Sequence, residues 1–315
     1  MKLFTQVEIP EFDFKANYNT NFLSIGSCFA ENMAFFLKRL KFKILSNPSG
    51  VLYNPISISN LINKSIQNHQ YLEQDLNLFD GLYFNYNFHS TFSNSSSTDA
   101  LKEMNLAILK TSEALKSVNI LLVTFGTTWV FSLKENGKTV ANCHKQVASK
   151  FKRTRLKIDE IFDVWQATIK NIKAINPDIQ IIFSVSPVRH IGDGLRENNL
   201  SKSVLLLAVE KICTEIENCH YFPSYEIILD ELRDYRFYDT DLVHPSKTAS
   251  EIVWKKLSNT LFNSETILLM QDVEKINKSL EHRAFNKDSE AYQKFQKHLE
   301  TEISKLKEKI PGIEF

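Results

Sequence analysis

The chain has 315 residues, of which 43% are hydrophobic and 24% charged, and its formal net charge is +1. This composition is that of a folded globular protein with a large core, and it excludes a disordered chain. The small net charge gives no reason to expect a nucleic-acid partner, and no run of about 18 apolar residues predicts a membrane-spanning helix.

Residues 1–19 lack the apolar core of a signal peptide. The four cysteines show no paired spacing, so we expect free thiols in a reducing, cytoplasmic setting: Cys28, Cys143, Cys213 and Cys219. A Cys213–Cys219 bridge is the alternative, and it is disfavoured.

The first predicted strand, residues 22–25, ends at Gly26. A helix follows, because apolar residues recur at intervals of three and four: Phe29, Met33, Phe36, Leu37 and Leu40. A strand, a turn and a helix start bring free backbone N–H groups and the positive end of the helix dipole together. Such a place stabilises a nucleophile or an anion, and here it holds Ser27 and Cys28.

Further along the chain, strands alternate with helices. Strands are expected at 42–45, 119–125, 179–185 and near 221–229, and helices at 57–66, 98–115, 154–173, 201–213 and 246–261. Thr98 or Asp99 is the expected N-cap of the second of these helices. The alternation predicts an α/β fold with a mainly parallel, doubly wound sheet. A small hairpin turning at residues 136–137 and a loop at 71–98, inserted over a site, complete this region.

Residues 262–315 differ from the rest, because they are charged, with helical apolar spacing. We therefore expect a domain of residues 1–261 followed by a helical extension of residues 262–315. The extension either packs back on the core, which we favour, or pairs with a second chain and makes a homo-oligomer.

Polar or small residues follow the predicted strands, where open parallel sheets form their sites. These segments are Gly26–Cys28, Asn47–Gly50, Gly126–Thr128, Ser186–His190 and Asp241–His244. They hold a nucleophile, turns with N–H donors and an Asp near a His, which are the groups that acyl transfer requires. Asp241 can hydrogen-bond Nδ1 of His244, leaving Nε2 as a general base.

Long motifs in order along the chain resemble the GSCFA family: GSCFAENM, NPSG, YNP, GTTWVF, NCHK, SPVRH, YFPSYEI, DELRDYRFY and DLVHPS. The resemblance covers residues 21–260. That family is similar to the GDSL-type SGNH hydrolases, which implies a three-layer α/β/α fold and a Ser nucleophile with a D-x-x-H motif. No cofactor is expected, and a zinc site using Cys28, Cys143, His144 and His244 is disfavoured because no two ligands are closely spaced.

The chain departs from the GDSL pattern at the nucleophile. An ungapped match places Cys28 at the Ser position, whereas a shift of one residue restores Ser27, and both stay candidates. For the oxyanion, the resemblance implies Gly50 and the turn from Gly126 to Thr128, with Asn142 or His144 replacing an Asn that is missing there. Arg189 and His190 suit an acidic or sugar-like group, and His89 is expected to be structural.

The sequence thus predicts an esterase with Ser27 or Cys28, His244 and Asp241 at its site, acting on a small-molecule or glycan ester. The alternatives are a glycan acyltransferase and a non-catalytic binding protein on a decayed hydrolase fold. Neither nucleic acid nor membrane is an expected partner.

Overall fold

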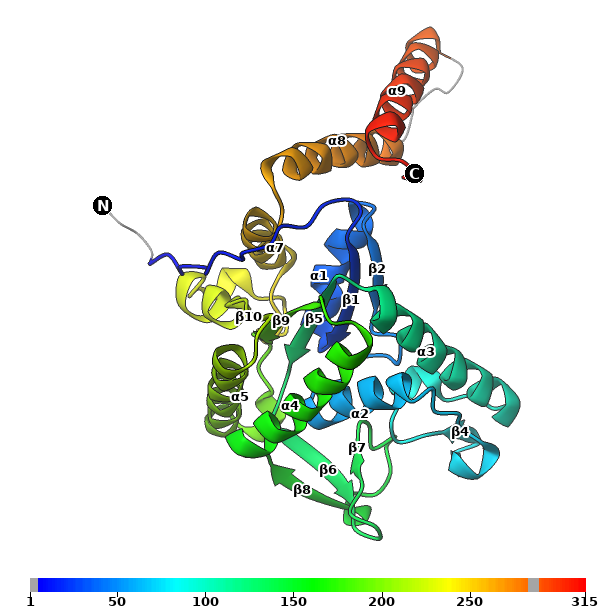
Figure 1. Cartoon of the computed structure of the whole chain (residues 1–315), viewed down its shortest axis with the longest axis vertical. Helices are drawn as coiled ribbons and strands as arrows, with labels where there is room; N and C mark the ends of the chain where they lie inside the picture. The colour runs from blue at the N-terminus through cyan, green and yellow to red at the C-terminus, as the bar shows by residue number, and fades with distance from the viewer. Residues whose placement is uncertain (1–4, 283–288) are drawn as a thin grey trace.

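The computed structural model describes residues 5–282 and 289–315 and centres on a five-stranded sheet (Figure 1). The strand order is β10 (Cys219–Tyr221), β9 (Gln180–Val185), β5 (Ile120–Phe125), β1 (Asn21–Gly26) and β2 (Lys43–Ser46). All four pairings are parallel, with Ile25 beside Val123 and Val123 beside Phe183. Every strand therefore ends at the same edge of the sheet.

The chain reverses its direction of winding beside β1. It passes from β1 to β2 on one side and then crosses to β5 on the other side. The two neighbouring strands β1 and β5 thus flank the topological switch point, where open parallel sheets form ligand sites.

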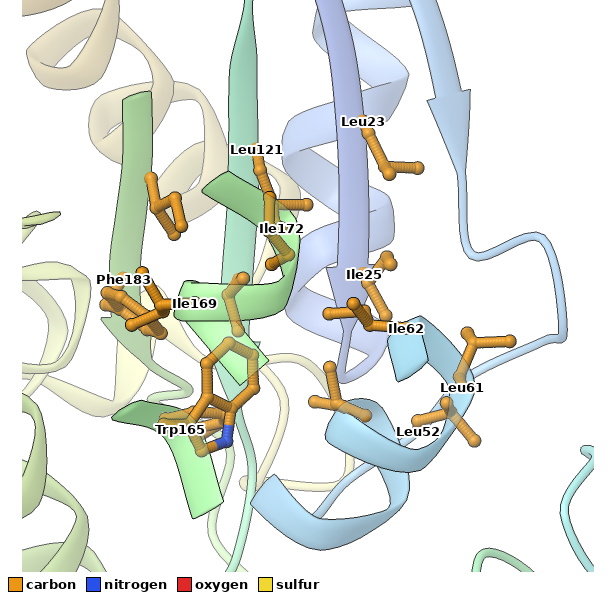
Figure 2. Packing of buried hydrophobic residues seen from close by; sticks show 14 of the residues in the cluster. Leu23, Ile25, Leu52, Leu61, Ile62, Leu121, Trp165, Ile169, Ile172 and Phe183 are labelled. Carbon is orange, nitrogen blue, oxygen red and sulfur yellow. The ribbon is translucent and has the colours of Figure 1, made fainter. Parts of the chain in front are cut away.

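Alternate residues of the inner strands enter two separate cores, because successive side chains of a strand point to opposite faces. Leu121 and Val123 lie in one core, together with α2 (Pro55–Ile66), α3 (Ser97–Ser117), α4 (Ile158–Ile175) and α5 (Leu195–Glu215). Figure 2 shows Trp165 of α4 in this core, and its ring centre lies 5.2 Å from that of Phe183. Ile120 and Leu122 lie in the other core, with α1 (Cys28–Arg39) and α7 (Lys247–Leu261). The predicted three-layer α/β/α fold with a mainly parallel sheet is confirmed.

The predicted C-terminal helices are α8 (Ser264–Glu281) and α9 (Glu290–Lys309), which extend away from the sheet (Figure 1). The guanidinium of Arg39, at the end of α1, contacts Glu274 at 2.8 Å and Glu281 at 2.6 Å. Apolar residues of both helices join the core that contains α1 and α7. The tail thus packs on its own chain, while its pairing with a second chain stays a prediction.

A small antiparallel sheet, β7–β6–β8, stands beside the carboxyl edge of the large one (Figure 1). Its strands β6 (Trp129–Leu133) and β7 (Thr139–Val140) form the predicted hairpin. The helix expected from residue 154 begins only at Ile158, because Phe151–Arg155 is the strand β8. This charged segment has little strand character of its own, and its pairing with β6 decides its conformation.

Other boundaries differ by a few residues. Ser96, and neither Thr98 nor Asp99, caps α3, because its Oγ accepts the backbone N–H of Asp99 at 3.2 Å. The segment 71–98 contains a hairpin of β3 (Asn77–Phe79) and β4 (Leu82–Phe84). Residues 224–231 are helical, as α6 (Ser224–Glu226) and a π-helical turn (Ile227–Glu231). Short 3₁₀ turns occupy Glu73–Asp75, Ser90–Phe92, Ala148–Lys150, Ile191–Asp193 and Tyr235–Phe237.

Candidate active site

A cavity of about 460 Å³ opens at the carboxyl edge of the sheet, where β1 and β5 end. One side, here called the sheet wall, consists of residues that follow the parallel strands: Cys28, Tyr53, Asn54, Ser186 and His190. The opposite side, here called the flap, consists of residues 129–155, with β6, β7 and β8. The volume lies within the range of small-molecule sites, so a ligand the size of a sugar would fit.

The turn after β1 holds the two candidate nucleophiles. Gly26 has φ +151°, and a Cβ there would lie 2.3 Å from the carbonyl oxygen of Thr124, so only glycine fits between β1 and β5. Ser27 is the N-cap of α1, yet it is 1% exposed, and its Oγ has no hydrogen-bond partner among the described residues. Cys28 is half-buried and lines the cavity. The thiol is therefore the more accessible of the two groups.

Opposing effects act on the Cys28 thiol. Burial raises its pKa, and the nearby Glu31 carboxylate acts in the same direction. The backbone N–H groups of Cys28 and Phe29 and the ammonium of Lys202 stabilise the thiolate and oppose this rise in pKa. Because the net direction is upward, a base is needed to remove the thiol proton at neutral pH.

His244 brings such a base to the same cavity. Its Nδ1 lies 2.6 Å from Oδ2 of Asp241, while Oδ1 accepts the backbone N–H groups of Val243 and His244 at 2.9 Å each. These hydrogen bonds lower the pKa of Asp241 to about 2, so its carboxylate is ionised at neutral pH. With Nδ1 held by Asp241, Nε2 is the nitrogen of His244 that is left to act as a base.

Two residues of the segment after β9 that the sequence analysis singled out line the cavity, Arg189 and His190. Burial, assisted by the charge of Lys202, lowers the pKa of His190 to about 4, so its imidazole is neutral at neutral pH. Its ring meets the edge of Tyr53 with centres 6.1 Å apart. No carboxylate of the described chain forms an ion pair with Arg189, which leaves its charge available to a ligand.

A buried lysine of α5 connects two strand ends behind the sheet wall. Lys202 is 1% exposed, and its Nζ donates to the carbonyl oxygens of Gly126 and Ser186, each at 2.6 Å. Burial and the charge of Arg189 lower the pKa of Lys202 to about 7, while the Cys28 thiolate acts in the opposite direction. Deprotonation of Cys28 and protonation of Lys202 therefore favour each other.

The flap presents an aromatic and cationic face. Trp129, Phe131 and Arg153 line the cavity, and the guanidinium carbon of Arg153 lies 3.9 Å from the Trp129 ring centre. Arg153 also forms an ion pair with Asp193, and Arg155 pairs with Glu197 at 3.1 Å. These pairs connect β8 to the first turn of α5 and to the segment just before it.

Family models cover most of the chain. The model of the GSCFA family matches residues 21–257, and that of the GSCFA domain protein, C-terminal domain, matches residues 273–315. This chain belongs to the GSCFA family. The first match includes the turn after β1, the flap and the Asp241–His244 pair, and the second includes α9.

Among curated proteins, no relative matches this GSCFA chain. Solved structures similar to it include a carbohydrate esterase family 3 protein from Talaromyces cellulolyticus (7% identity, 80% of this chain and 99% of that one, TM-score 0.37). An acetyl xylan esterase from Butyrivibrio proteoclasticus is 15% identical over 79% and 64% of the two chains, with a TM-score of 0.38. The lipopolysaccharide acetyltransferase periplasmic domain of Salmonella ser. Paratyphi A is 13% identical over 77% and 84%, with a TM-score of 0.34. These TM-scores are too low to bear on the activity of the GSCFA chain.

Two glycines expected to hold the oxyanion do not line the cavity. The N–H of Gly50 donates to the carbonyl of Asn47 at 2.8 Å, and His89 packs closely against the Gly50 Cα. The N–H of Gly126 donates to the carbonyl of Tyr53 at 2.7 Å. Both donors are thus used to shape the strand-end loops.

Thr128 and His144 also lie outside the cavity lining. The backbone N–H and the hydroxyl of Thr128 both donate to Oγ of Ser201, at 2.8 and 2.9 Å. The His144 ring stacks on Phe84 and its Nε2 lies 3.1 Å from the carbonyl oxygen of Phe88, so it holds two loops together. Of the expected oxyanion residues, Asn142 lines the cavity, and so does Thr127 of the turn from Gly126 to Thr128, whose N–H donates to the carbonyl of Tyr53 at 3.0 Å.

Asn54, Lys202 and Trp129 are among the residues at the site that the sequence analysis does not propose for it. Asn54 precedes Pro55, a pattern that marks a helix start but not a cavity. Lys202 lies on the buried side of α5, three residues before Leu205 and seven before Val209. A charged residue in register with these apolar residues is the feature of the sequence that could have pointed to it. Trp129 belongs to the predicted hairpin. The position of this hairpin over the cavity depends on its pairing with β8, which the sequence analysis does not predict.

Within residues 5–282 and 289–315, no group of three or more His, Cys, Asp or Glu side chains is placed to hold a metal ion. In the same part of the chain, none of the helices combines the length and apolarity needed to cross a bilayer.

Proposed function

We propose that this GSCFA protein is an acyl-handling enzyme that cleaves an ester through the Cys28 thiol. The observation that carries the proposal is the arrangement of one cavity. An accessible thiol at the start of α1 and an imidazole held by a carboxylate both line it. A nucleophile, a base and a group that orients the base are the minimal set for covalent acyl transfer.

The reaction has two steps. Nε2 of His244 takes the Cys28 proton, and the sulfur attacks the ester carbonyl to form a tetrahedral oxyanion. The oxyanion collapses to a thioester while His244 gives the proton to the departing alcohol. His244 then removes a proton from water, which attacks the thioester, and Cys28 leaves as a thiolate that regains the proton. Asp241 orients His244 and stabilises its charged form.

The substrate class follows from the lining. Arg189, without an acidic partner in the described chain, supports an anionic group on the substrate, and Asn142 adds an amide that can bond hydroxyls. The aromatic face of the flap suits the apolar face of a sugar ring. We therefore propose an ester on an acidic, hydroxylated molecule of carbohydrate type. A reducing, cytoplasmic setting is part of the proposal, since it would keep Cys28 as a thiol.

Turnover of 4-nitrophenyl acetate by the wild type and three variants tests the proposal. Cys28→Ala and His244→Ala are each expected to lower kcat/KM by about 10³-fold or more, since triad residues act as a unit. Ser27→Ala should change it less than about threefold and should leave the fold intact, because it removes a buried hydroxyl without a partner. Full activity of Cys28→Ala would overturn the proposal, and loss in Ser27→Ala alone would transfer the role to Ser27.

Labelling separates an enzyme from a binding protein. Iodoacetamide should modify Cys28 in a Cys143→Ser background, which removes the other half-buried thiol of the cavity. Mass spectrometry after mixing with the ester should show an acetyl group on the same residue. If neither label reaches Cys28, the decayed-hydrolase alternative is supported. Transfer of the acetyl group to an added sugar in preference to water would favour the acyltransferase alternative.

A further inference from the structure

Attack on an ester carbonyl puts negative charge on the carbonyl oxygen, and enzymes of this kind hold that oxygen with fixed N–H donors. At the Cys28 site, the first N–H groups of α1 are available because the start of a helix leaves them without intrahelical partners. The N–H of Gly50, that of Gly126 and both donors of Thr128 are engaged elsewhere. A side-chain donor on the sheet wall is therefore needed to complete the set.

Asn54 offers such a donor. It is the N-cap of α2, and its side chain accepts the backbone N–H of Ser57 at 2.8 Å. Only an oxygen can accept this bond, so the Asn54 amide has a single assignment, with Oδ1 on the helix and Nδ2 directed elsewhere. Asn54 is 5% exposed and lines the cavity, and no hydrogen bond of the described chain takes up its Nδ2. Nδ2 is not among the buried side-chain atoms that lack a partner, so it is open to the cavity, where a ligand oxygen can accept its hydrogen bond.

The backbone places Asn54 beside the nucleophile. The carbonyl oxygen of Tyr53 accepts the N–H groups of Gly126 and Thr127 at 2.7 and 3.0 Å, which joins this segment to the end of β5. β5 is the neighbour of β1, whose end carries Cys28. Tyr53 is also close enough to Cys28 for the two groups to interact electrostatically. We propose that Nδ2 of Asn54 and the backbone N–H of Cys28 form the oxyanion hole, an inference that rests on the proposed function.

The cavity has one other amide with a fixed orientation. Oδ1 of Asn142 accepts the N–H of His144 at 2.8 Å, which likewise leaves its Nδ2 to the cavity. Asn142 belongs to the flap, however, so it faces the substrate from the side opposite α1. We assign its amide to substrate binding. Replacing either Asn54 or Asn142 by serine therefore separates oxyanion stabilisation from substrate binding.

The variants are chosen so that α2 keeps its cap. Serine and aspartate are both good N-caps, so Asn54→Ser and Asn54→Asp should unfold within about 3 °C of the wild type while lacking the Nδ2 donor. Removal of one oxyanion donor is expected to lower kcat by about 10²–10³-fold with little change in KM. Asn142→Ser should mainly raise KM.

Alkylation provides the decisive control, because iodoacetamide reacts with Cys28 by displacement at carbon and forms no oxyanion. Asn54→Ser should therefore be alkylated within about twofold of the wild-type rate while 4-nitrophenyl acetate turnover falls. Full turnover in both Asn54 variants, or a kcat loss in Asn142→Ser alone, overturns the assignment. An equal loss of alkylation and turnover also overturns it, since Asn54 would then act on the thiol. Full turnover in Cys28→Ala would instead contradict the proposed function itself.

Discussion

The two sides of the cavity are held in part by different forces. The sheet wall is fixed by short backbone hydrogen bonds, by the carbonyl of Tyr53 and by the buried ammonium of Lys202. In the flap, the backbone N–H groups of Ala141 and Asn142 donate to the carbonyl of Tyr86, but the outer strand β8 is joined to the start of α5 by ion pairs of half-exposed side chains, those of Arg153 and Arg155. Such pairs contribute little and adapt readily, whereas buried hydrogen bonds keep groups in place. The difference suggests that chemistry belongs to the sheet wall and substrate selection to the flap.

The largest expected effect concerns the group that orients the base. Asp241→Asn keeps an oxygen for the N–H groups of Val243 and His244 but directs an amide N–H at Nδ1 of His244. The imidazole must then adopt the wrong tautomer, and kcat should fall by about 10³–10⁴-fold with an unchanged fold. Steady-state kinetics and circular dichroism test this. A loss below tenfold would mean that Asp241 has no such role.

The second effect concerns stability and pH. The pKa of Lys202 is about 7 in the folded chain, against 10.5 ordinarily. Between these values the unfolded chain binds a proton that the folded chain lacks, so Lys202 makes the fold more stable as pH rises from about 7 to 10.5, and this gain is lost as pH falls. The slope is at most about 1.4 kcal/mol per pH unit.

Urea unfolding of the wild type and Lys202→Met across this range measures the slope as a difference. The wild type should gain stability relative to Lys202→Met as pH rises. Lys211→Met is the matched control, because Lys211 pairs with Asp159 on the outside of the same helix, and its difference should be flat from pH 7 to 9. Parallel curves for wild type and Lys202→Met would show that the buried amine has an ordinary pKa.

Lys202 also marks the limit of what the sequence can predict. The parallel sheet can be predicted from local patterns, namely the apolar strands that end at Gly26 and Gly126. The hydrogen bond between Asp241 and His244 can be predicted from their spacing of three residues. In contrast, β8 and the contacts of Lys202 depend on residues distant along the chain, and no local pattern encodes them. Gly50 and Gly126, which were expected to hold the oxyanion, lie outside the cavity lining for a related reason. A turn glycine offers an N–H, but only the fold decides whether another carbonyl has already taken it.

The third effect concerns the binding of an anionic substrate by Arg189, which follows β9. Arg189→Gln should raise KM about tenfold for 4-acetoxybenzenesulfonate, an anionic aryl acetate, and leave that for phenyl acetate within about twofold, because one ligand ion pair is worth about 1–2 kcal/mol when partly buried. The two esters share the acetyl group and differ in the sulfonate. An equal change for both would show that Arg189 supports the loop and does not select charge.

The smallest effect would test the flap alone. Arg153→Met keeps a flexible apolar chain over the Trp129 ring but removes the cation and its pair with Asp193. Since exposed pairs contribute about 0–1 kcal/mol, the melting temperature should fall by no more than about 2 °C. KM for polar esters should rise about three- to tenfold, while kcat stays the same. A fall in kcat of more than tenfold would mean that the flap positions the catalytic groups, and the division of labour between the two walls would then be wrong. An unchanged kcat would instead support a site in which the sheet edge performs the reaction and the flap selects what enters.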